Sequence, residues 1–557
     1  LVAQLNKKAK VPTRKALKDK MEDIKKTLES EVALMLDDEF VAITTDGWTS
    51  RSTETYMSLT VAYIDTEWTL RHLSLDCLKH TGSTLGEDLA ESITNMIKRH
   101  DLTGRVVACV TDCEPSMVKA GRLLEVGGEM EHVGCCNHRM ESTTSSVFNG
   151  KSLGAVAKAR GLVGRYKRSS QMTARLEEMR RILQMQELQV MQDVETRWWS
   201  TWAMIVRLLF LLKAIKLHES MDDIPPVLTE TDWEVLRLVE PILQPFMQAQ
   251  KDLEGSKYVT GSMTIPKIAE LRDGLEAAIV DLRNVAQTGL KDTTKEAMQA
   301  VLPDAEALWE DFKNRWGDGS SILEYKEGRR RQPQGFKLQQ VFATALDPRS
   351  KHLYGIRPEE HGGVWRAVAS RAVGVAFEKY TSDKASASGG TPATQPVQTP
   401  PNTTDGVPEP KRRRVGAFEA AAAAHAADAT AGSVGVESPD ERRAQLAAIV
   451  DLEVAAFKAA PGLALRDKTD AFTNPLDWWR KNQLEFPLLA GLARRVLAIP
   501  SSQAQSERMF SVAGLTVTAT RSCLTDDSVD LLVYLRNVWG VVDEWRKSAV
   551  RKKKAAT

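Results

Sequence analysis

The stretch that decides the fold lies near the carboxyl end of the chain and reads Pro500-Ser-Ser-Gln-Ala-Gln-Ser-Glu507-Arg-Met-Phe510-Ser-Val-Ala-Gly514. Pro500 ends the preceding element, because proline cannot continue a helix that precedes it. Ser502 and Gln505 have the spacing of a capping box, in which each side chain bonds the backbone of the other residue. A short helix is therefore predicted to begin here.

On this helix Ala504, Glu507 and Phe510 recur every three residues, so the glutamate shares a stripe with apolar neighbours. An ionised carboxylate is costly to bury unless it is paired or binds a cation. We therefore expect Glu507 to have a partner, and one candidate is a metal ion held jointly with other acids. The alternative is a glutamate at the edge of a packed face.

The composition is that of an ordinary soluble protein, with 557 residues, 42% hydrophobic and 27% charged. That length predicts roughly three to four domains. No apolar run is long enough to span a membrane, and the six scattered cysteines favour a reducing compartment over a disulfide framework. The first residue is Leu1 rather than Met, so we interpret the chain as a fragment of a longer protein.

Two aspartates follow apolar runs that have the pattern of buried strands. Phe40-Val-Ala-Ile43 leads to Asp46-Gly47, a strong turn signal, so Asp46 is expected at the end of a strand. Two alternating strands and a helix over 84–99 follow. The next strand, 105–112, is apolar on both faces and ends at Asp112, as in a central parallel strand. This order is shared by the ribonuclease-H-like fold, in which acids on the first and fourth strands meet.

From about residue 142 to 474 the pattern is helix after helix, including a basic amphipathic helix over 155–181. Its cations are either a solvated face or contacts for a phosphate backbone. Arg197, Trp198 and two further tryptophans stand together within this block. They are interpreted either as core at a helix start or as an aromatic platform for an unstacked base.

A Pro-, Thr-, Gly- and Ala-rich stretch at about 382–442 is predicted to be a disordered linker, with a short helix at 418–424. Within it a compact basic cluster indicates nuclear import, or simply a solvated run of charge; it consists of Lys411, Arg412, Arg413 and Arg414.

Six motifs, in order along nearly the whole chain, resemble the hAT superfamily of DNA transposases. They are Thr45-Asp46-Gly-Trp-Thr-Ser50, Thr111-Asp112, Cys135-x-x-His138, Thr196-Arg197-Trp198, Leu346-Asp347-Pro348-Arg349, and the run from Trp479 to Gly514 that contains Ser506-Glu507-Arg508. The chain differs from the family's usual Asn-Ala-Ser at Cys113-Glu114-Pro115, which places a further acid beside Asp112. The family's usual amino-terminal BED zinc finger is expected to be absent from this chain.

The resemblance implies an α/β fold, a ribonuclease-H-like mixed sheet interrupted by a large all-α insertion domain. We divide the chain into a basic helical segment (1–36), the first part of the core (37–150), the insertion domain (151–473), the second part of the core with the dimerisation region (474–540), and a basic tail (541–557). Asp46, Asp112 and Glu507 would act as catalytic residues and hold two Mg²⁺ or Mn²⁺ ions, which suit carboxylate oxygens.

By the same resemblance the chain would act in the nucleus as a dimer or larger homo-oligomer, with no membrane partner. It would cut transposon ends, close hairpins on flanking DNA and join the ends to target DNA. DNA contacts are expected from Arg197, Trp198, Arg160, Arg165, Lys167 and Arg168. Cys135 and His138 provide only two ligands of a zinc site, so a role in shaping the active site is favoured.

Self-association is also expected from surplus apolar surface on the last helices, at Leu488, Leu489, Leu492, Val496 and Leu497 and at Leu531, Leu532, Leu535 and Val538. The alternative is that these side chains cover the sheet. Two other functions remain open: a domesticated, catalytically inactive DNA-binding dimer, and a ribonuclease-H-like nuclease unrelated to transposition.

Overall fold

The computed structural model describes residues 13–49, 54–126, 130–145, 152–194, 198–284, 289–317, 326–327, 333–388, 438–516 and 526–556. The chain forms two compact units. Leu1–Val364, Gly462–Leu476 and Ala493–Thr557 make up the first unit, and Trp365–Pro461 with Asp477–Leu492 make up the second. Residues 477–492 thus group with the preceding helices, although the sequence motifs assign them to the second part of the core.

A five-stranded mixed sheet forms the centre of the first unit, in the order β3-β2-β1-β4-β5. β1 pairs antiparallel with β2 and β2 with β3, whereas β4 is parallel to β1 and to β5. The strands are β1 (Val41–Thr49), β2 (Thr55–Ile64), β3 (Leu70–Lys79), β4 (Val106–Thr111) and β5 (Glu131–Gly134). This order confirms the predicted ribonuclease-H-like sheet.

The turn predicted at Asp46-Gly47 is wrong, because β1 continues through both residues to Thr49. Asp46 lies opposite Ser58 in the antiparallel ladder, and Gly47 lies opposite Met57. Backbone pairing with the long strand β2 overrides the local turn preference of Asp-Gly. Asp46 is still close to the carboxyl end of the strand.

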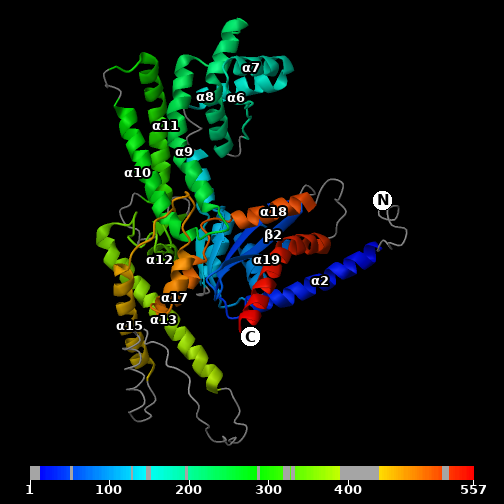
Figure 1. Cartoon of the computed structure of the whole chain (residues 1–557), viewed down its shortest axis with the longest axis vertical. Helices are drawn as coiled ribbons and strands as arrows, with labels where there is room; N and C mark the ends of the chain where they lie inside the picture. Colours follow the sequence, from blue (N-terminus) through cyan, green and yellow to red (C-terminus); the bar gives the residue numbers. More distant parts are fainter. Residues whose placement is uncertain are drawn as a thin grey trace, which may run out of the picture. The chain divides into compact units, whose positions relative to one another are not determined.

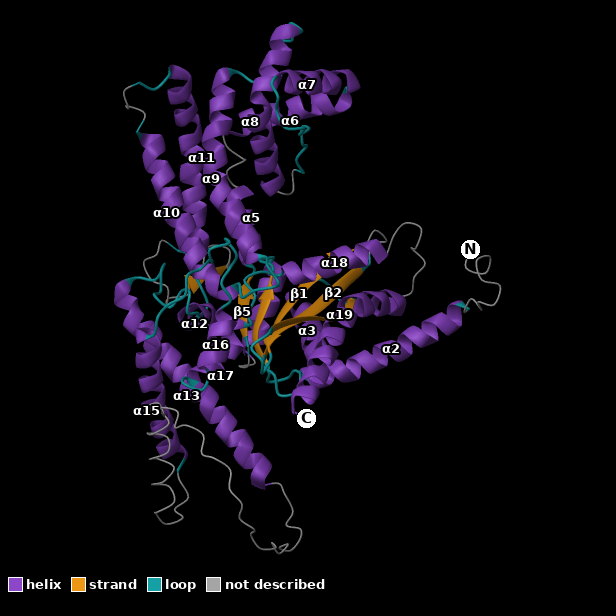
Figure 2. Ribbon diagram, viewed as in Figure 1, coloured by secondary structure: helices purple, strands orange, loops and turns teal. Residues whose placement is uncertain are grey.

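Helices cover both faces of the sheet (Figures 1 and 2). One face packs in a single hydrophobic core with α2 (Arg14–Met35), α3 (Gly86–Arg99), α4 (Pro115–Val126) and part of α19 (Asp526–Ala556). On the other face Met509, Phe510 and Ala513 of α18 (Ala504–Thr516) form a smaller core with Tyr56 and Cys77. Asp46 and Trp48 alternate with the residues of β1 that enter the large core, so they lie on the α18 face.

Successive helices follow the sheet in the first unit, and all but the first of them fall within the predicted insertion (151–473). They are α5 (Cys136–Ser145), α6 (Ser152–Arg168), α7 (Ser170–Ile182), α8 (Trp198–Met221), α9 (Glu230–Leu253), α10 (Thr264–Arg283), α11 (Asp292–Trp316) and α12 (Leu338–Leu346), with a 3₁₀ turn at Gly261–Met263 and a small two-stranded sheet, β6 (Lys326–Glu327) and β7 (Pro333–Gln334). The single helix predicted over 155–181 is in fact two helices. Ser169 separates them, because its side chain accepts a hydrogen bond from the Met172 N–H and caps α7.

The second unit contains most of α13 (Pro358–Ser388) and α15 (Pro439–Ala459), with parts of α16 (Pro475–Asn482) and α17 (Pro487–Leu497). Its core includes a cluster of four aromatic rings: Phe457, Trp478, Trp479 and Phe486 pack with centroids 5.2–6.5 Å apart. Residues at both ends of the predicted linker are helical, since α13 runs to Ser388 and α15 begins at Pro439. The predicted short helix at 418–424 lies outside the described residues.

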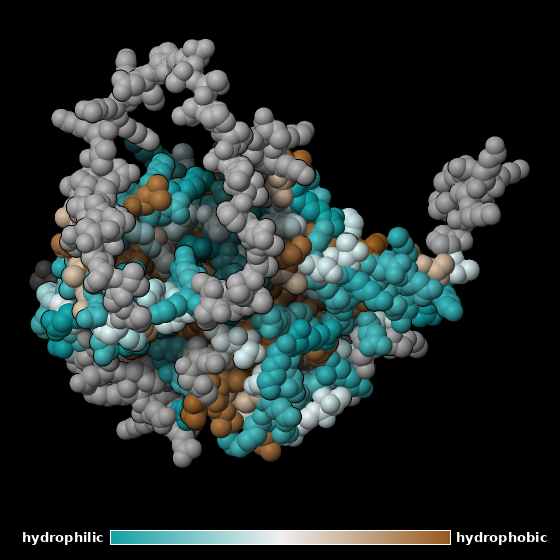
Figure 3. Space-filling model, turned by 90° about the horizontal axis from the view of Figure 1, so that it is seen from below, coloured by the Kyte–Doolittle hydropathy of each residue, from teal (hydrophilic) through white to brown (hydrophobic). Residues whose placement is uncertain are grey.

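The apolar residues expected to drive self-association are largely buried within the chain. Leu489, Leu492, Val496 and Leu497 are at most 1% exposed, and Leu531 and Val538 are at most 4% exposed. The alternative, that they complete the chain's own core, accounts for them. The face seen in Figure 3 is mainly hydrophilic, with smaller hydrophobic areas between. No helix in the described ranges is long and apolar enough to cross a membrane.

Candidate active site

Asp46 lies near the end of β1, and Asp112 directly follows β4, the neighbouring parallel strand. Thr44 of β1 pairs with Val110 of β4, so the positions two residues further along, 46 and 112, are side by side. Each backbone fixes its carboxylate locally: the Gly47 N–H donates to Asp46 at 2.8 Å, and the Glu114 N–H donates to Asp112 at 3.2 Å. The sheet therefore brings together two of the three predicted acids.

Glu507 is brought to this end of β1 by the first turn of α18. The residue before it, Ser506, is completely buried, and its hydroxyl lies 2.7 Å from that of Thr44, which also bonds Thr60. Further along the helix, Phe510 stacks on Trp48 of β1 with ring centroids 6.0 Å apart. Two contacts thus fix α18 along the strand that carries Asp46.

Two expectations about this helix are wrong. The Ser502 hydroxyl does not cap α18, because it donates to the carbonyl oxygen of Leu253 at 3.2 Å. Nor is Glu507 buried: Ser506, Met509, Phe510 and Ala513 form the buried stripe, and Glu507 is exposed beside it, which agrees with the alternative of a glutamate at the edge of a packed face. The helix is rotated so that Ser506, rather than its neighbour, faces the sheet. The desolvation penalty of burial therefore applies to Asp46 and Asp112 rather than to Glu507.

Burial, together with the nearby charges of Asp112, Glu507 and Glu114, raises the pKa of Asp46 to about 7, against the opposing hydrogen bond from Gly47. Burial likewise raises the pKa of Asp112, while His138 lowers it. Neither aspartate forms an ion pair with a lysine or arginine among the described residues. The site is a concentration of negative charge, as expected where a cation binds.

The donor set fits Mg²⁺ or Mn²⁺, because these ions prefer carboxylate oxygens and, among the described residues, no lysine or arginine neutralises the two aspartates. The side chains do not, however, point at a common centre. In the described part of the chain, no three His, Cys, Asp or Glu side chains have the arrangement of a metal site. The backbone therefore brings the three acids to one end of β1, without a ready metal site among the described side chains.

Cys135 joins the end of β5 to the start of α18. Its thiol is completely buried and accepts a hydrogen bond from the Gln503 N–H at 3.4 Å. Burial holds its pKa well above the ordinary value, so it stays a neutral thiol. His138 lies on α5 close enough to Asp112 to affect that carboxyl group. Both residues therefore lie beside the acids, and their role in shaping the site stays a prediction.

The segment before α18 is bonded to the loop between α9 and α10. The Ser501 hydroxyl donates to the carbonyl oxygen of Leu253 at 2.6 Å, and the Ser501 N–H donates to the Thr260 hydroxyl at 3.2 Å. Gly261 approaches this segment so closely that a Cβ there would overlap the carbonyl oxygen of Ile499. The insertion domain thus directly supports the helix of Glu507.

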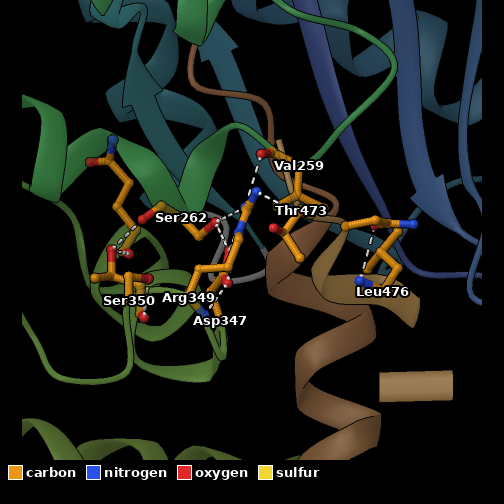
Figure 4. Close-up of polar contacts among 10 residues, drawn as sticks. Val259, Ser262, Asp347, Arg349, Ser350, Thr473 and Leu476 are labelled. Atoms are coloured by element: carbon orange, nitrogen blue, oxygen red, sulfur yellow. Dashed lines mark hydrogen bonds and ion pairs between the residues drawn. The ribbon is translucent and has the colours of Figure 1, made fainter. Parts of the chain in front are cut away.

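This loop is itself held by a buried ion pair, shown in Figure 4. Arg349 Nη2 lies 2.6 Å from an oxygen of Asp347, and both side chains are 1% exposed. Arg349 also donates to the carbonyl oxygens of Val259 and Thr473, and the Ser262 hydroxyl donates to Asp347 at 2.6 Å. Asp347 and Arg349 of the Asp-Pro-Arg motif thus hold the 259–262 loop in place.

The residues expected to contact DNA differ in how accessible they are. Arg165, Lys167 and Arg168 are exposed on α6. Arg160 instead pairs with the buried carboxylate of Asp193 at 2.6 Å, so its charge is used within the insertion domain.

Trp198 is only 3% exposed, whereas its neighbour Trp199 is 36% exposed. The buried position fits the core alternative, because a base stacks only on an accessible ring face. Arg197 and the basic cluster from Lys411 to Arg414 lie outside the described residues.

Two features of the site were missed from the sequence. The Thr44–Ser506 hydroxyl pair sets the helix against the strand, and Glu254 lies near Glu507, whose charge adds to burial in raising the Glu254 pKa. For the hydroxyl pair a signal exists, because Thr44 shares a strand face with Asp46. The sequence carries no such signal for Glu254, because its position near Glu507 depends on where α9 ends in the folded chain.

The sheet order and its paired aspartates define a ribonuclease-H-like protein with a helical insertion. Comparison with known proteins agrees: residues 44–127 match the ZBED1 RNase-like domain, and residues 133–242 match the ZBED1 RNase-like helical domain. Residues 461–538 match the hAT family C-terminal dimerisation region. These matches confirm the relationship to hAT-type transposases that the motifs predict.

Relatives along most of the chain agree with this assignment. The chain is 22% identical over 521 residues to the putative AC transposase of Zea mays, covering 88% of this chain and 55% of that protein. It is 20% identical to the BED zinc-finger protein RICESLEEPER 2 of Oryza sativa, covering 88% and 64%, and 22% identical to human zinc finger BED domain-containing protein 4, covering 89% and 37%. The chain thus spans less than two thirds of the length of these relatives.

Proposed function

We propose that the chain is a metal-dependent DNA transposase that cuts DNA at the ends of a mobile element and joins those ends to a target. The observation that carries this proposal is the convergence of Asp46 and Asp112 at the ends of neighbouring strands, with the first turn of α18, and so Glu507, fixed beside them by Ser506. The family relationship supports the same reaction class.

In this proposal Asp46, Asp112 and Glu507 hold two Mg²⁺ or Mn²⁺ ions. Bound metal would supply an activated water and relieve charge on the leaving oxygen of a phosphodiester. The chain's own part is to gather three carboxylates, to keep two of them largely desolvated, and to hold them through strands and a helix rather than loops. Cys135 and His138 complete the wall around Asp112.

The reaction we propose has three stages. Water cuts one strand at the transposon end, the freed 3′-hydroxyl attacks the opposite strand to close a hairpin on the flanking DNA, and the excised 3′-ends attack the target. Arg165, Lys167 and Arg168 are accessible for phosphates, and Arg197 keeps the same proposed role. A stacking role for Trp198 would require the ring to become exposed.

Two further proposals follow from the relatives. Residues 461–538 match a dimerisation region, so the chain is proposed to act as a homodimer or larger homo-oligomer that holds two DNA ends. A protein that acts on chromosomal DNA works in the nucleus, and the cluster from Lys411 to Arg414 is the proposed import signal.

A second candidate is a domesticated protein that binds DNA and dimerises without cutting. It is favoured by one observation, that the acids do not form a ready ligand cluster in the described part of the chain. An end-labelled duplex carrying the terminal repeats that flank the gene separates the two. Hairpin products in Mg²⁺ support the transposase, whereas binding without any cleavage in Mg²⁺ or Mn²⁺ supports the domesticated protein.

Asp46→Asn, Asp112→Asn and Glu507→Gln should each abolish cleavage while leaving DNA binding intact, because each removes a ligand charge with little change in shape. Glu276→Gln is a matched control, since Glu276 is exposed on α10, away from the sheet. Wild-type cleavage by any of the three variants would contradict the assignment of that acid.

A further inference from the structure

A buried arginine without a carboxylate partner lies in the insertion domain. Arg180, in the last turn of α7, is 6% exposed, and none of the described residues forms an ion pair with it. Its Nη1 donates to the carbonyl oxygen of Gln186 at 3.3 Å, and its buried Nε has no hydrogen-bond partner there. Because an uncompensated buried charge is strongly unfavourable, this guanidinium is suited to an anion from outside the chain.

Arg349 shows what a satisfied arginine looks like in the same unit. It is similarly buried, yet it pairs with Asp347 and donates to two carbonyl oxygens. Arg160 likewise pairs with Asp193. The single carbonyl contact of Arg180 therefore leaves more of its donors unused than in Arg349.

Arg180 lines a cavity of about 240 Å³ between α6, α7 and the segment that follows them. The exposed side chain of Lys167 lines the same cavity and forms no ion pair with a described residue. Gln189 adds an amide, and Glu177 adds one negative charge. The cavity thus combines two cations and one acid, with a net charge of +1.

We infer that this cavity binds a phosphodiester group of the DNA backbone. A guanidinium presents its donors in a fork that matches phosphate oxygens, and a lysine adds a point charge. Because Glu177 leaves a single net positive charge, the cavity matches the single negative charge of a phosphodiester better than the higher charge of free phosphate. The inference rests on the proposed DNA binding and names a contact for it that lies apart from the acids.

Binding of the full chain to a fluorescent duplex of arbitrary sequence, titrated at several salt concentrations in EDTA, tests this. Arg180→Gln and Lys167→Gln should each lower the slope of log affinity against log salt by about 1, because each removes one phosphate contact. Arg181→Gln is the matched control, since Arg181 is exposed, adjoins Arg180 and does not line the cavity. Wild-type slopes for both cavity variants, or an equal loss in the control, would overturn the inference.

Folding of the variants is checked by thermal melting in the absence of DNA. Arg180→Gln should melt at the wild-type temperature or above it, because it removes an uncompensated charge. If Arg180→Gln does not fold, Arg180→Met, which removes the same charge at similar length, takes its place, and a wild-type salt slope for that variant overturns the inference.

A second arm replaces DNA with inorganic phosphate at constant ionic strength. One outcome would show that the ligand is free phosphate and that the DNA assignment is wrong. In it, phosphate raises the melting temperature of the wild type but not of Arg180→Gln, while both cavity variants keep the wild-type salt slope for DNA binding. The binding assay is run in EDTA, where no metal-dependent cleavage takes place. Its result therefore tests this inference even if the chain proves unable to cleave DNA.

Discussion

The side-chain hydroxyls of Thr44 and Ser506 lie 2.7 Å apart, although 462 positions separate the two residues in the chain. Thr44 shares a strand with Asp46, and Ser506 adjoins Glu507, so this contact, together with the stacking of Phe510 on Trp48, positions two proposed ligands relative to each other. The strand and the helix belong to opposite ends of the sequence, and the insertion domain lies between them.

Ser506→Ala should remove this contact. We expect a loss of about 1 kcal/mol in the free energy of unfolding, the usual contribution of such a hydrogen bond, together with slower DNA cleavage because Glu507 is less well fixed. Denaturant unfolding and a cleavage time course measure the two effects. Ser511→Ala, on the exposed side of the same helix, should change neither; if Ser506→Ala behaved in the same way, the positioning role would be wrong.

Gly261→Ala tests the support of α18 by the insertion domain. The added Cβ would overlap the carbonyl oxygen of Ile499, so we expect destabilisation of roughly 1–3 kcal/mol and reduced cleavage. The matched control is Gly274→Ala within α10, where a Cβ meets nothing within 4 Å. That change should stabilise the chain by roughly 0.5–1 kcal/mol, since alanine is the better helix former. Equal melting temperatures for the two variants would contradict this account.

Asp347→Asn should be among the most damaging single changes in the first unit. It leaves Arg349 buried without its counter-ion, which costs roughly 3–5 kcal/mol. For comparison, Glu306→Gln breaks a pair between Arg283 and Glu306 that is 60% and 42% exposed, and should cost less than about 1 kcal/mol. Chemical unfolding of both variants gives the two values, and a small loss for Asp347→Asn would show that the pair is not what fastens the loop.

A pH effect is expected in the second unit. The carboxylate of Glu453 accepts hydrogen bonds from the Leu488 and Leu489 N–H groups at the start of α17, and burial raises its pKa to about 7. The folded state thus keeps a proton that the unfolded state releases above about pH 4.5, so stability falls as pH rises from there to about 7.

Glu453→Gln should abolish this loss, because the amide keeps an oxygen acceptor without the charge. At pH 8 we expect the variant to be more stable, by at most about 3 kcal/mol, and to match the wild type near pH 4.5. Protection factors of the Leu488 and Leu489 amides against hydrogen exchange report this locally. A wild-type dependence on pH in the variant would exclude Glu453 as its source.

Strand periodicity predicted the sheet, and the placement of Asp46 and Asp112 at strand ends, because such periodicity is a local signal in the sequence. The alternation of Met57, Leu59, Val61 and Tyr63 identifies β2, and all four side chains enter the large hydrophobic core. The predictions that were wrong concern features that depend on tertiary contacts. Pairing with β2 straightened Asp46-Gly47, and a carbonyl of α9 took the Ser502 hydroxyl that was expected to cap α18.

The rotation of α18 was the more consequential error. A spacing of three matched Glu507 to Ala504 and Phe510, but the buried stripe passes through Ser506, Met509 and Ala513 as well as Phe510. A buried serine between two polar neighbours looks like a solvent-facing residue until Thr44 is placed opposite it. The conclusion that Glu507 belongs to the site is therefore supported by its position beside β1 rather than by burial.

The central claim is that Asp46, Asp112 and Glu507 act as one metal-binding unit. Its most direct test is a Mn²⁺ titration of the full chain, followed by the electron paramagnetic resonance signal of free Mn²⁺, with and without duplex DNA. We predict that the wild type takes up Mn²⁺, that Asp46→Asn and Asp112→Asn lose most of this uptake, that Glu507→Gln weakens it, and that Glu276→Gln leaves it unchanged. Uptake by all three acid variants at the wild-type level, or none by the wild type in either condition, would contradict the account.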